Sequence, residues 1–422
     1  MVSVLRGGTF LQAPKDIRLG SSGGALAVAL SILILSFPQI FGKIGILVLY
    51  LIWLPQLVRK GPVLVAPTPV LVLAMALPLW AALSSLWASD LHATLRSAIE
   101  FISLIVCVSI VARLVKTDDF IRGGAAASMV GVIGGLFSRG FLGGVVGLHY
   151  SMDLIMGSKN QLGMVAALGV LFGLLNLRRL RAHGRVGALG WAQLALGIAV
   201  LLHSHSAGAT VSAAAAGATA CVVMVARRAP ASIRRGLLVL LVLGLVLSSA
   251  VSLLAIGGLD GALHDIGKSS TLTGRTYLWA MGLKAAVQHP LLGYGYESFW
   301  VHGRPMAEQL WYQFSIESRA GFHFHNALVE TLVEMGAVGV ILLCFVAGRS
   351  VLSCLGSALG NRPWSDEALL GLTLMTFFIV RSAVEVDVLG PFGEAAFLFY
   401  GVALRLDACR RFARARESAE VA

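Results

Sequence analysis

Hydrophobic residues in this chain gather in long runs that short polar segments separate. A membrane-spanning α-helix needs about twenty predominantly apolar residues, and about twelve runs approach or reach that length. The runs lie at 24–40, 44–58, 68–88, 98–114, 122–140, 160–177, 187–203, 207–227, 236–257, 326–348, 366–384 and 391–406. The second and the last are short, so a count of about ten or eleven stays open. The pattern predicts an all-α polytopic membrane protein.

Composition supports a membrane protein and argues against a soluble one. The 422 residues are 57% hydrophobic and 13% charged, whereas soluble globular domains carry about a quarter charged residues. The net charge of +12 would by itself fit a nucleic-acid partner. The basic residues instead form short clusters between the apolar runs, which is the pattern of membrane topology. We therefore expect no nucleic-acid partner.

The basic clusters also predict the orientation, because Lys and Arg concentrate in cytoplasmic loops. With the N-terminus inside, the inner segments hold most of the 33 Lys and Arg residues, so both termini are predicted to be cytoplasmic. The predicted parts are a cytoplasmic segment 1–23, spans 1–9 within 24–257, an outer loop 258–325, spans 10–12 within 326–406, and a basic cytoplasmic tail 407–422.

The outer loop 258–325 is too long and too aromatic to be a simple tether. Loops longer than about fifteen residues are usually functional or disordered, and many aromatics favour a folded element. Within it, apolar residues from Leu278 to Ala286 recur at helical spacing. We expect a short amphipathic helix, capped at Thr271 or Thr273 and ended by Pro290, on the membrane surface or over a cavity.

Nearly all of the ten histidines, with His183 as the exception, fall on the predicted outer side. Histidine titrates near neutrality and can act as a general base. Two pairs, His203 with His205 and His323 with His325, have the spacing of chelating ligands. A metal site needs three or four ligands in suitable geometry. The candidate carboxylates are Asp153, Asp265 and Glu317. Nothing in the sequence brings them together, so we predict no metal and no cofactor.

Polar residues also cluster at the predicted outer ends of several spans. Ionisable groups at such depth are costly unless they face a wet cavity or pair with one another. The alternative is a snorkelling role at the interface. Together with Arg275 and His325 they could line one outward-facing cavity. The clusters are Lys159-Asn160-Gln161, Ser204-His205-Ser206, and Arg381 with Glu385 and Asp387.

Three segments resemble the superfamily of O-antigen ligases and Wzy-type polysaccharide polymerases. They are GRTYLW at 274–279, HPLLGYG at 289–295 and HNALVETLVEMGAVG at 325–339. Segments 86–90 and 158–163 resemble the family as well. No single segment is specific to the family. The three segments together are specific, because they occur in this order in a long outer loop late in the chain.

The resemblance implies a metal-independent glycosyltransferase of the GT-C type in the bacterial inner (plasma) membrane. Such an enzyme moves a glycan from a polyprenyl-diphosphate carrier to an acceptor hydroxyl at the periplasmic face. Arg275 would stabilise the diphosphate, since a guanidinium binds oxygens in pairs. His325 would take or orient the proton of the acceptor hydroxyl. Candidate substrate-binding residues are Lys159, Asn160, Ser204, His205, Ser206, Trp279, Tyr294, Arg319, His323, Asn326, Arg381 and Glu385.

The chain departs from the ligase-like members at one place. These usually carry an arginine in a Ser-rich element before the eighth span, where this chain reads HSHSAG at 203–208. Exopolysaccharide polymerase-like members often show a Ser-Lys-Ser-Ala pattern there, which this chain resembles more. Lys159, Arg319 or Arg381 would then supply a second cation.

We therefore expect a polymerase of exopolysaccharide or O-antigen repeat units. A ligase that moves glycan to a lipid acceptor is the nearest alternative, and a transporter or flippase of lipid-linked oligosaccharide is an alternative of another class. The expected partners are a polyprenyl-diphosphate-linked oligosaccharide, an acceptor glycan or glycolipid, membrane lipids, and a chain-length regulator or export complex.

Overall fold

A computed structural model describes residues 19–136, 158–180, 184–226, 229–230, 232–237, 239–240, 244, 269–359 and 366–421, and these ranges contain no β-strand. The helices are α1 (Ser21–Ser36), α2 (Pro38–Lys60), α3 (Pro69–Leu83), α4 (Leu91–Leu114), α5 (Thr117–Leu136), α8 (Lys159–Leu180), α9 (Gly184–His203), α10 (Ala207–Ala226), α13 (Ser269–Ala286), α14 (Pro305–Gln313), α15 (Ala327–Leu359), α16 (Asp366–Ser382) and α17 (Glu394–Val421). Short 3-10 helices, η1 (Pro62–Val65) and η2 (Ser84–Leu86), flank α3.

The helices fall on the predicted apolar runs. A helix covers each run except the ninth, 236–257, which lies almost entirely outside the described residues. Among the described residues, six helices are long and apolar enough to cross a bilayer, and Ser22–Ser36 and Ala188–His203 are shorter apolar helices. The chain is thus an all-helical, multi-pass membrane protein. The count of about twelve spans and the GT-C arrangement stay predictions.

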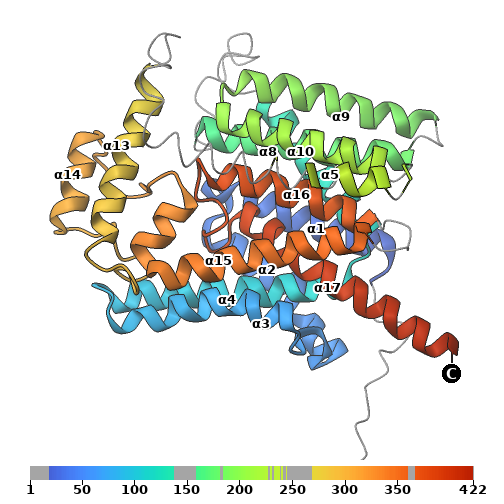
Figure 1. Cartoon of the computed structure of the whole chain (residues 1–422), viewed down its shortest axis with the longest axis horizontal. Coiled ribbons are helices and arrows are strands. Elements are labelled where there is room, and N and C mark those ends of the chain that lie inside the picture. The colour runs from blue at the N-terminus through green and yellow to red at the C-terminus, as the bar shows by residue number, and fades with distance from the viewer. Residues whose placement is uncertain are drawn as a thin grey trace, which may run out of the picture.

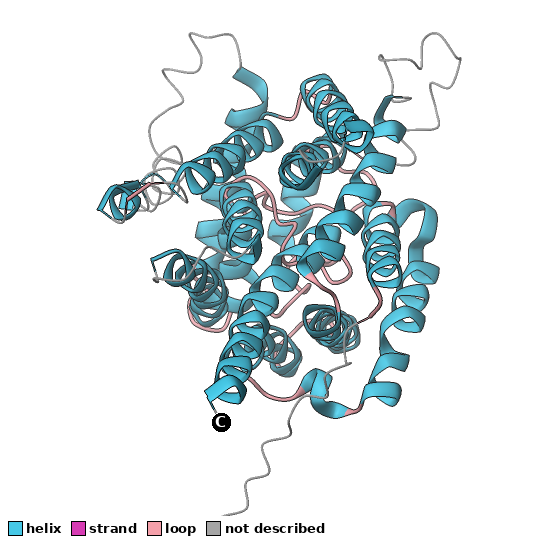
Figure 2. Cartoon of the chain, turned by 90° about the vertical axis from the view of Figure 1, so that its right-hand side faces the viewer, coloured by secondary structure: helices cyan, strands magenta, loops and turns pink. Residues whose placement is uncertain are grey.

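The long helices run side by side along the longest axis of the molecule (Figure 1). Helices α13 and α14 lie at one end, and the C-terminal end of α17 lies at the other. Seen after a quarter turn, many helices point toward the viewer and surround the connecting loops (Figure 2). The bundle therefore has two distinct ends, and the described polar networks fall at those ends.

One end is held together by Arg405, a buried residue of α17. Its guanidinium donates to the Glu367 carboxylate (2.7 Å) and to the Val115 carbonyl (2.8 Å). The Leu19 N–H donates to the Leu114 carbonyl (3.1 Å) at the same place. The beginning of α1, the end of α4 and the beginning of α16 therefore meet. The charge pattern predicts that this end is cytoplasmic.

The helix α15 is broken at Gly336, and a loop completes its backbone. Gly336 has φ 66° and ψ −170°, so the helical ladder is interrupted there. The carbonyls of 333–334 accept hydrogen bonds from the N–H groups of 294–295 (2.9 and 2.8 Å), and the Ala337 N–H donates to the Pro290 carbonyl (2.9 Å). Backbone groups at membrane depth need such partners. The Gly-Tyr-Gly and Met-Gly patterns thus belong to one interlocked element.

A second hydrophobic core joins α13 and α14 to the beginning of α15. It is built from Leu278, Trp279, Ala285, Ala286, Phe299, Ala307, Leu310, Trp311, Phe324, Val329 and Val333. Helix α13 ends at Ala286, before Pro290, as predicted. The predicted cap was wrong, because the helix already begins at Ser269, so Thr271 and Thr273 lie inside it. Its apolar face packs on α15, which places this module at the end of the bundle that the charge pattern predicts to face outward.

Candidate functional site

The residue after His325 begins α15 and ties two loops together. The Asn326 side-chain oxygen accepts hydrogen bonds from the N–H groups of 328–329 (3.0 and 3.1 Å), which is a helix N-cap. Its amide nitrogen donates to the Ala383 carbonyl (3.1 Å), in the loop after α16. His325 itself has φ +51°, a left-handed conformation that histidine adopts more readily than most residues. The sequence thus fixes His325 in a defined turn.

The loop before His325 is anchored through Phe324. The Phe324 N–H donates to the Glu330 carboxylate (2.6 Å), and the Phe324 carbonyl accepts from the Trp279 indole (2.7 Å). The other Glu330 oxygen accepts from the Trp300 indole (2.9 Å). Both backbone groups of the residue before His325 are therefore held by side chains, that of Trp279 on α13 and that of Glu330 on α15.

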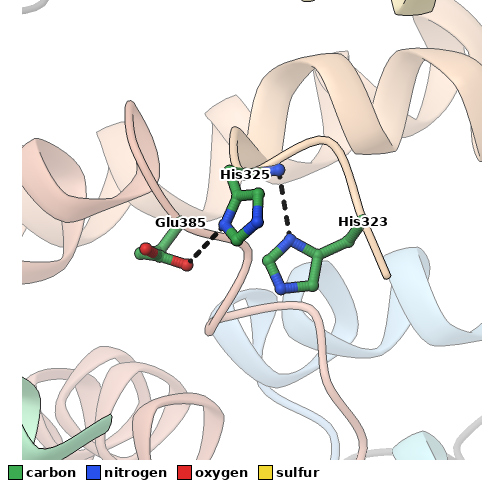
Figure 3. A group of neighbouring side chains, drawn as sticks. All are labelled: His323, His325 and Glu385. Carbon is green, nitrogen blue, oxygen red and sulfur yellow. Dashed lines mark hydrogen bonds and ion pairs between the residues drawn. The ribbon is translucent and has the colours of Figure 1, made fainter. Parts of the chain in front are cut away.

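Glu385, in the loop between α16 and α17, is the centre of the site. One of its oxygens accepts from the Arg275 guanidinium (3.0 Å) and from the Asn160 amide (2.7 Å). The other lies 3.2 Å from the His325 Nδ1 (Figure 3). An ionised carboxylate only accepts hydrogen bonds, so the hydrogen of this contact sits on Nδ1. The His325 Nε2 is then left as a proton acceptor.

The charges around Glu385 keep it ionised although it is buried. Burial raises the pKa of its carboxyl, but the hydrogen bond and charge of His325 and the charges of Arg381 and Arg275 outweigh this and lower the pKa to about 2. For His323, burial and the nearby His325 lower the pKa to about 4. The neutral His323 Nδ1 accepts the His325 backbone N–H (3.1 Å), and the two ring centroids lie 4.1 Å apart (Figure 3).

A second guanidinium, that of Arg381, borders this group. Arg381 is buried, pairs with Asp387, and donates to the Asn160 carbonyl (3.2 Å). Its remaining nitrogen, Nη1, has no hydrogen-bond partner among the described residues. The Asn160 side-chain oxygen accepts from the Ser206 hydroxyl (3.1 Å). The structure therefore brings Asn160, Ser206, Arg381 and Glu385 together at the ends of three helices, α8, α10 and α16.

Other predicted site residues have partners elsewhere. The Tyr294 hydroxyl donates to Gln288 (2.8 Å), and its ring lies under the Arg304 guanidinium (4.4 Å). Arg319 is exposed and pairs with Glu308 (3.3 Å). Trp279 is buried in the second core and supports the Phe324 backbone, as described above. Tyr294 and Trp279 therefore have a structural role. That they also contact sugar stays a prediction.

Three further predicted residues flank the network without a described contact to Glu385. The Ser204 hydroxyl donates to the Leu201 carbonyl (2.6 Å). His205 is exposed and faces His203, with ring centroids 6.1 Å apart. Lys159 is exposed beside Asn160. Of the three candidates for a second cation, Arg381 is the one that the structure places in the network.

Among the described residues, one group of side chains has the atoms and the spacing to hold a metal ion. His323, His325 and Glu385 each offer an atom, and these atoms lie within 4.8 Å of one another. Of the carboxylates that the sequence suggested for such a pair, Asp153 and Asp265 lie outside the described residues. The carboxylate in the observed group is Glu385, and both of its oxygens already contact other side chains. The guanidinium of Arg275 would also repel a divalent cation. Metal-free operation remains a prediction.

The sequence predicted one outward-facing cavity lined by the polar span ends with Arg275 and His325. The structure has a cavity beside the network whose wall includes Gln161 and Asp387 of those groups, but neither Arg275 nor His325. The volume of this cavity is about 440 Å³, and His323 also forms part of its wall.

Other parts of the wall come from Glu330, Glu334 and Glu394, which we did not predict as site residues. One feature of the sequence could have identified these three residues. Each is a carboxylate inside or at the start of an apolar run, where a charge is costly unless it has a functional role.

Two comparisons with known proteins agree on a family. Residues 192–344 match the sequence profile of a family described as O-antigen ligase. The "Exopolysaccharide production protein ExoQ" of Rhizobium meliloti (strain 1021) is 35% identical over 396 residues, which cover 92% of this chain and 89% of that protein. The similarity therefore extends over nearly the whole chain.

Proposed function

Because the chain belongs to the superfamily of O-antigen ligases and Wzy-type polysaccharide polymerases, we propose that it polymerises repeat units of an exopolysaccharide. The donor would be a glycan on a polyprenyl diphosphate, and the acceptor a hydroxyl of a second lipid-linked unit at the periplasmic face. One observation carries this proposal. A single carboxylate, Glu385, holds a cation, Arg275, and a candidate base, His325, side by side.

The arrangement suits displacement of a diphosphate. The acceptor oxygen forms a bond to the anomeric carbon, and the bond from that carbon to the diphosphate oxygen breaks. The proton of the hydroxyl passes to the His325 Nε2. The diphosphate leaves with an added negative charge, which Arg275 and Arg381 would stabilise. Glu385 would stabilise the imidazolium that forms, since it already contacts Nδ1 (3.2 Å).

The two family activities differ in the acceptor. The name of the relative, an exopolysaccharide production protein, and the absence of arginine from 203–208 favour a polymerase. The family description, O-antigen ligase, favours transfer to a lipid acceptor. The products distinguish them, because a polymerase gives longer glycans on the carrier and a ligase gives a glycan-bearing acceptor lipid. Movement of the lipid-linked sugar without a new glycosidic bond would instead identify a transporter.

The proposal is tested with purified protein in liposomes that contain a polyprenyl-diphosphate-linked glycan. We expect Arg275→Ala and His325→Ala to lower the transfer rate by about 100-fold or more, because each removes a transition-state contact. Matched controls are Arg96→Ala and His92→Ala on the exposed surface of α4, which should transfer at the wild-type rate. We expect transfer to continue in EDTA. Full transfer by either site variant would contradict the mechanism.

A further inference from the structure

The cavity of about 440 Å³ beside the Glu385 network lies among elements that are distant in sequence. It falls within the range of about 300–1,000 Å³ that is usual for small-molecule sites. Its wall comes from the ends of α1 and α2, from α8, α14 and α15, and from the loops 296–300, 320–323 and 386–395. His323 borders it, and its ring contacts that of His325. A ligand in the cavity would therefore sit beside the candidate base.

The wall contains buried polar atoms that lack partners. Trp311 and Glu394 line the cavity and are each 2% exposed. The Trp311 Nε1 and both carboxylate oxygens of Glu394 have no hydrogen-bond partner among the described residues. The nearby Ser36 hydroxyl has already given its hydrogen to the Ile32 carbonyl (2.7 Å). Because unpaired buried polar groups are costly, a ligand that both donates and accepts would stabilise this wall.

The wall is also rich in acidic side chains. The described residues that line it include five carboxyl groups and no Lys or Arg. These groups belong to Glu297, Glu330, Glu334, Asp387 and Glu394. Burial lowers the pKa of His323 to about 4, so this side chain adds no positive charge near neutral pH. A phosphate or a carboxylate of a ligand would find no Lys or Arg partner in the described wall, whereas hydroxyl groups would find hydrogen-bond partners among the carboxyl groups.

Aromatic rings complete the wall and argue for a sugar rather than a metal cation. Tyr296, Trp300, Trp311, Phe322 and Phe392 line the cavity among the carboxyl groups. Such a wall, largely apolar with a few convergent polar groups, is typical of a site for an organic molecule. A hard cation would gain nothing from the rings and would need several oxygens at bonding distance.

We propose that this cavity binds an uncharged sugar residue of the acceptor glycan and presents its hydroxyl to His325. The inference rests on the proposed glycan transfer and adds to it a preference for acceptors with an uncharged terminal sugar. The donor diphosphate belongs on the side of Arg275 and Arg381, which are not part of the cavity wall. The two substrates are thus separated by charge, and an acceptor whose terminal sugar carries a carboxylate is rejected.

Binding is measured with two probes and the full-length protein in nanodiscs, without any donor. One probe is a neutral hexose tetrasaccharide with a photoreactive diazirine. The other is the same tetrasaccharide with its terminal hexose oxidised to the uronic acid. We expect the neutral probe to label segments 296–323 and 386–395 and to bind at least about tenfold more tightly than the acidic one, since the acidic probe brings an unpaired charge. Equal binding of both, or labelling elsewhere, would overturn the proposal.

Two variants test which side chains of the cavity wall bind the neutral probe. Trp311→Phe removes the indole N–H but keeps an aromatic ring, and Glu394→Gln replaces one carboxyl oxygen by an NH2 group but keeps the shape. Each should weaken binding of the neutral probe by about tenfold, the effect of one lost hydrogen bond in a buried site. The matched controls Trp191→Phe, exposed on α9, and Glu317→Gln, exposed after α14, should bind like the wild type. Wild-type binding by both cavity variants would contradict the assignment.

The binding assay is independent of the transfer assay. Binding by the wild type without any glycosidic bond formation would leave the cavity assignment intact and remove the proposed function. Transfer with a KM for the acceptor that Glu394→Gln and Trp311→Phe leave unchanged would remove the cavity assignment alone. Saturable binding of calcium ions that Glu394→Gln abolishes, with no binding of the neutral probe, would identify a cation site and overturn the proposal.

Discussion

At the scale of single residues, one buried carboxylate organises the candidate site. Glu385 accepts hydrogen bonds from three side chains on three different helices or their flanking turns. A carboxylate with such donors stays ionised in spite of burial. His323 shows the opposite case, because burial and the nearby His325 lower its pKa and keep it neutral. The residue next to the candidate base therefore does not compete with it for protons.

The neutral His323 has a consequence for stability in acid. Its pKa falls from the ordinary 6.5 to about 4 in the folded protein. As the pH drops from 6.5 toward 4, the unfolded chain takes up this proton first, so folding becomes less favourable. Glu385, with a pKa of about 2, adds to this loss only below its ordinary value of 4.5. We predict that His323→Gln flattens the decline of the melting temperature in detergent between pH 6.5 and 4.5.

The matched control for this experiment is His92→Gln, at an exposed position of α4. It should leave the pH dependence of the wild type unchanged. A His323→Gln variant that loses stability in acid as steeply as the wild type would show that His323 titrates normally in the folded protein.

At the scale of elements, the break in α15 positions both the base and the cavity. The helix begins at the Asn326 cap beside His325 and carries Glu330 and Glu334 in the cavity wall. Loop 289–295 replaces the hydrogen bonds that the break at Gly336 leaves open. The Trp80 indole also donates to the Met335 carbonyl (2.9 Å), which locks the break against α3. The two family segments around 290 and 336 are therefore one structural unit.

Gly336→Ala should destabilise this unit strongly. A Cβ at this position would lie 2.1 Å from the Leu291 carbonyl oxygen, and φ is +66°. We expect a loss of at least about 2 kcal/mol in the free energy of unfolding, measured by thermal denaturation in detergent. Gly348→Ala in the same helix is the control, because no heavy atom lies within 4 Å of its added Cβ. A Gly336→Ala protein as stable as this control would refute the interlocked backbone.

At the scale of the whole molecule, two buried polar networks occupy opposite ends of the bundle. Glu367 and Arg381 lie at the two ends of α16, about 20 Å apart at the rise of an α-helix. Arg405 and Glu367 form one network, and Arg381 with Glu385 belongs to the other. The basic residues predict that the first faces the cytoplasm. The candidate site would then open to the periplasm, where lipid-linked glycans would meet their acceptors.

This orientation predicts the labelling of two single cysteines in a chain freed of its native ones. Glu317→Cys, exposed after α14, should react with a membrane-impermeant maleimide in intact spheroplasts. Arg59→Cys, exposed at the end of α2, should react only in inverted vesicles. The reverse pattern would place the site on the cytoplasmic side and exclude the proposed reaction.

Much of the fold follows from apolar runs, because a bilayer demands helices of a given length. The site could be predicted in part, since Arg275 and His325 fall in family-like segments. Glu385 was predicted as a substrate-binding residue near them, but its direct contact with both could not be predicted, because it lies 110 residues from Arg275 and 60 from His325 in the sequence. Nor does the sequence distinguish Arg381 from Arg319 as a second cation. Only the tertiary packing buries one and pairs the other with Glu308 at the surface.

The most direct test of the whole account is the initial rate of glycan transfer by Glu385→Gln in liposomes. The amide keeps the size of the side chain but loses the charge that holds Arg275 and orients His325. We predict a rate lower by about 100-fold, as expected for the loss of a catalytic contact, and partial recovery in Glu385→Asp. A correctly inserted Glu385→Gln protein that transfers glycan within about twofold of the wild-type rate would contradict the central claim.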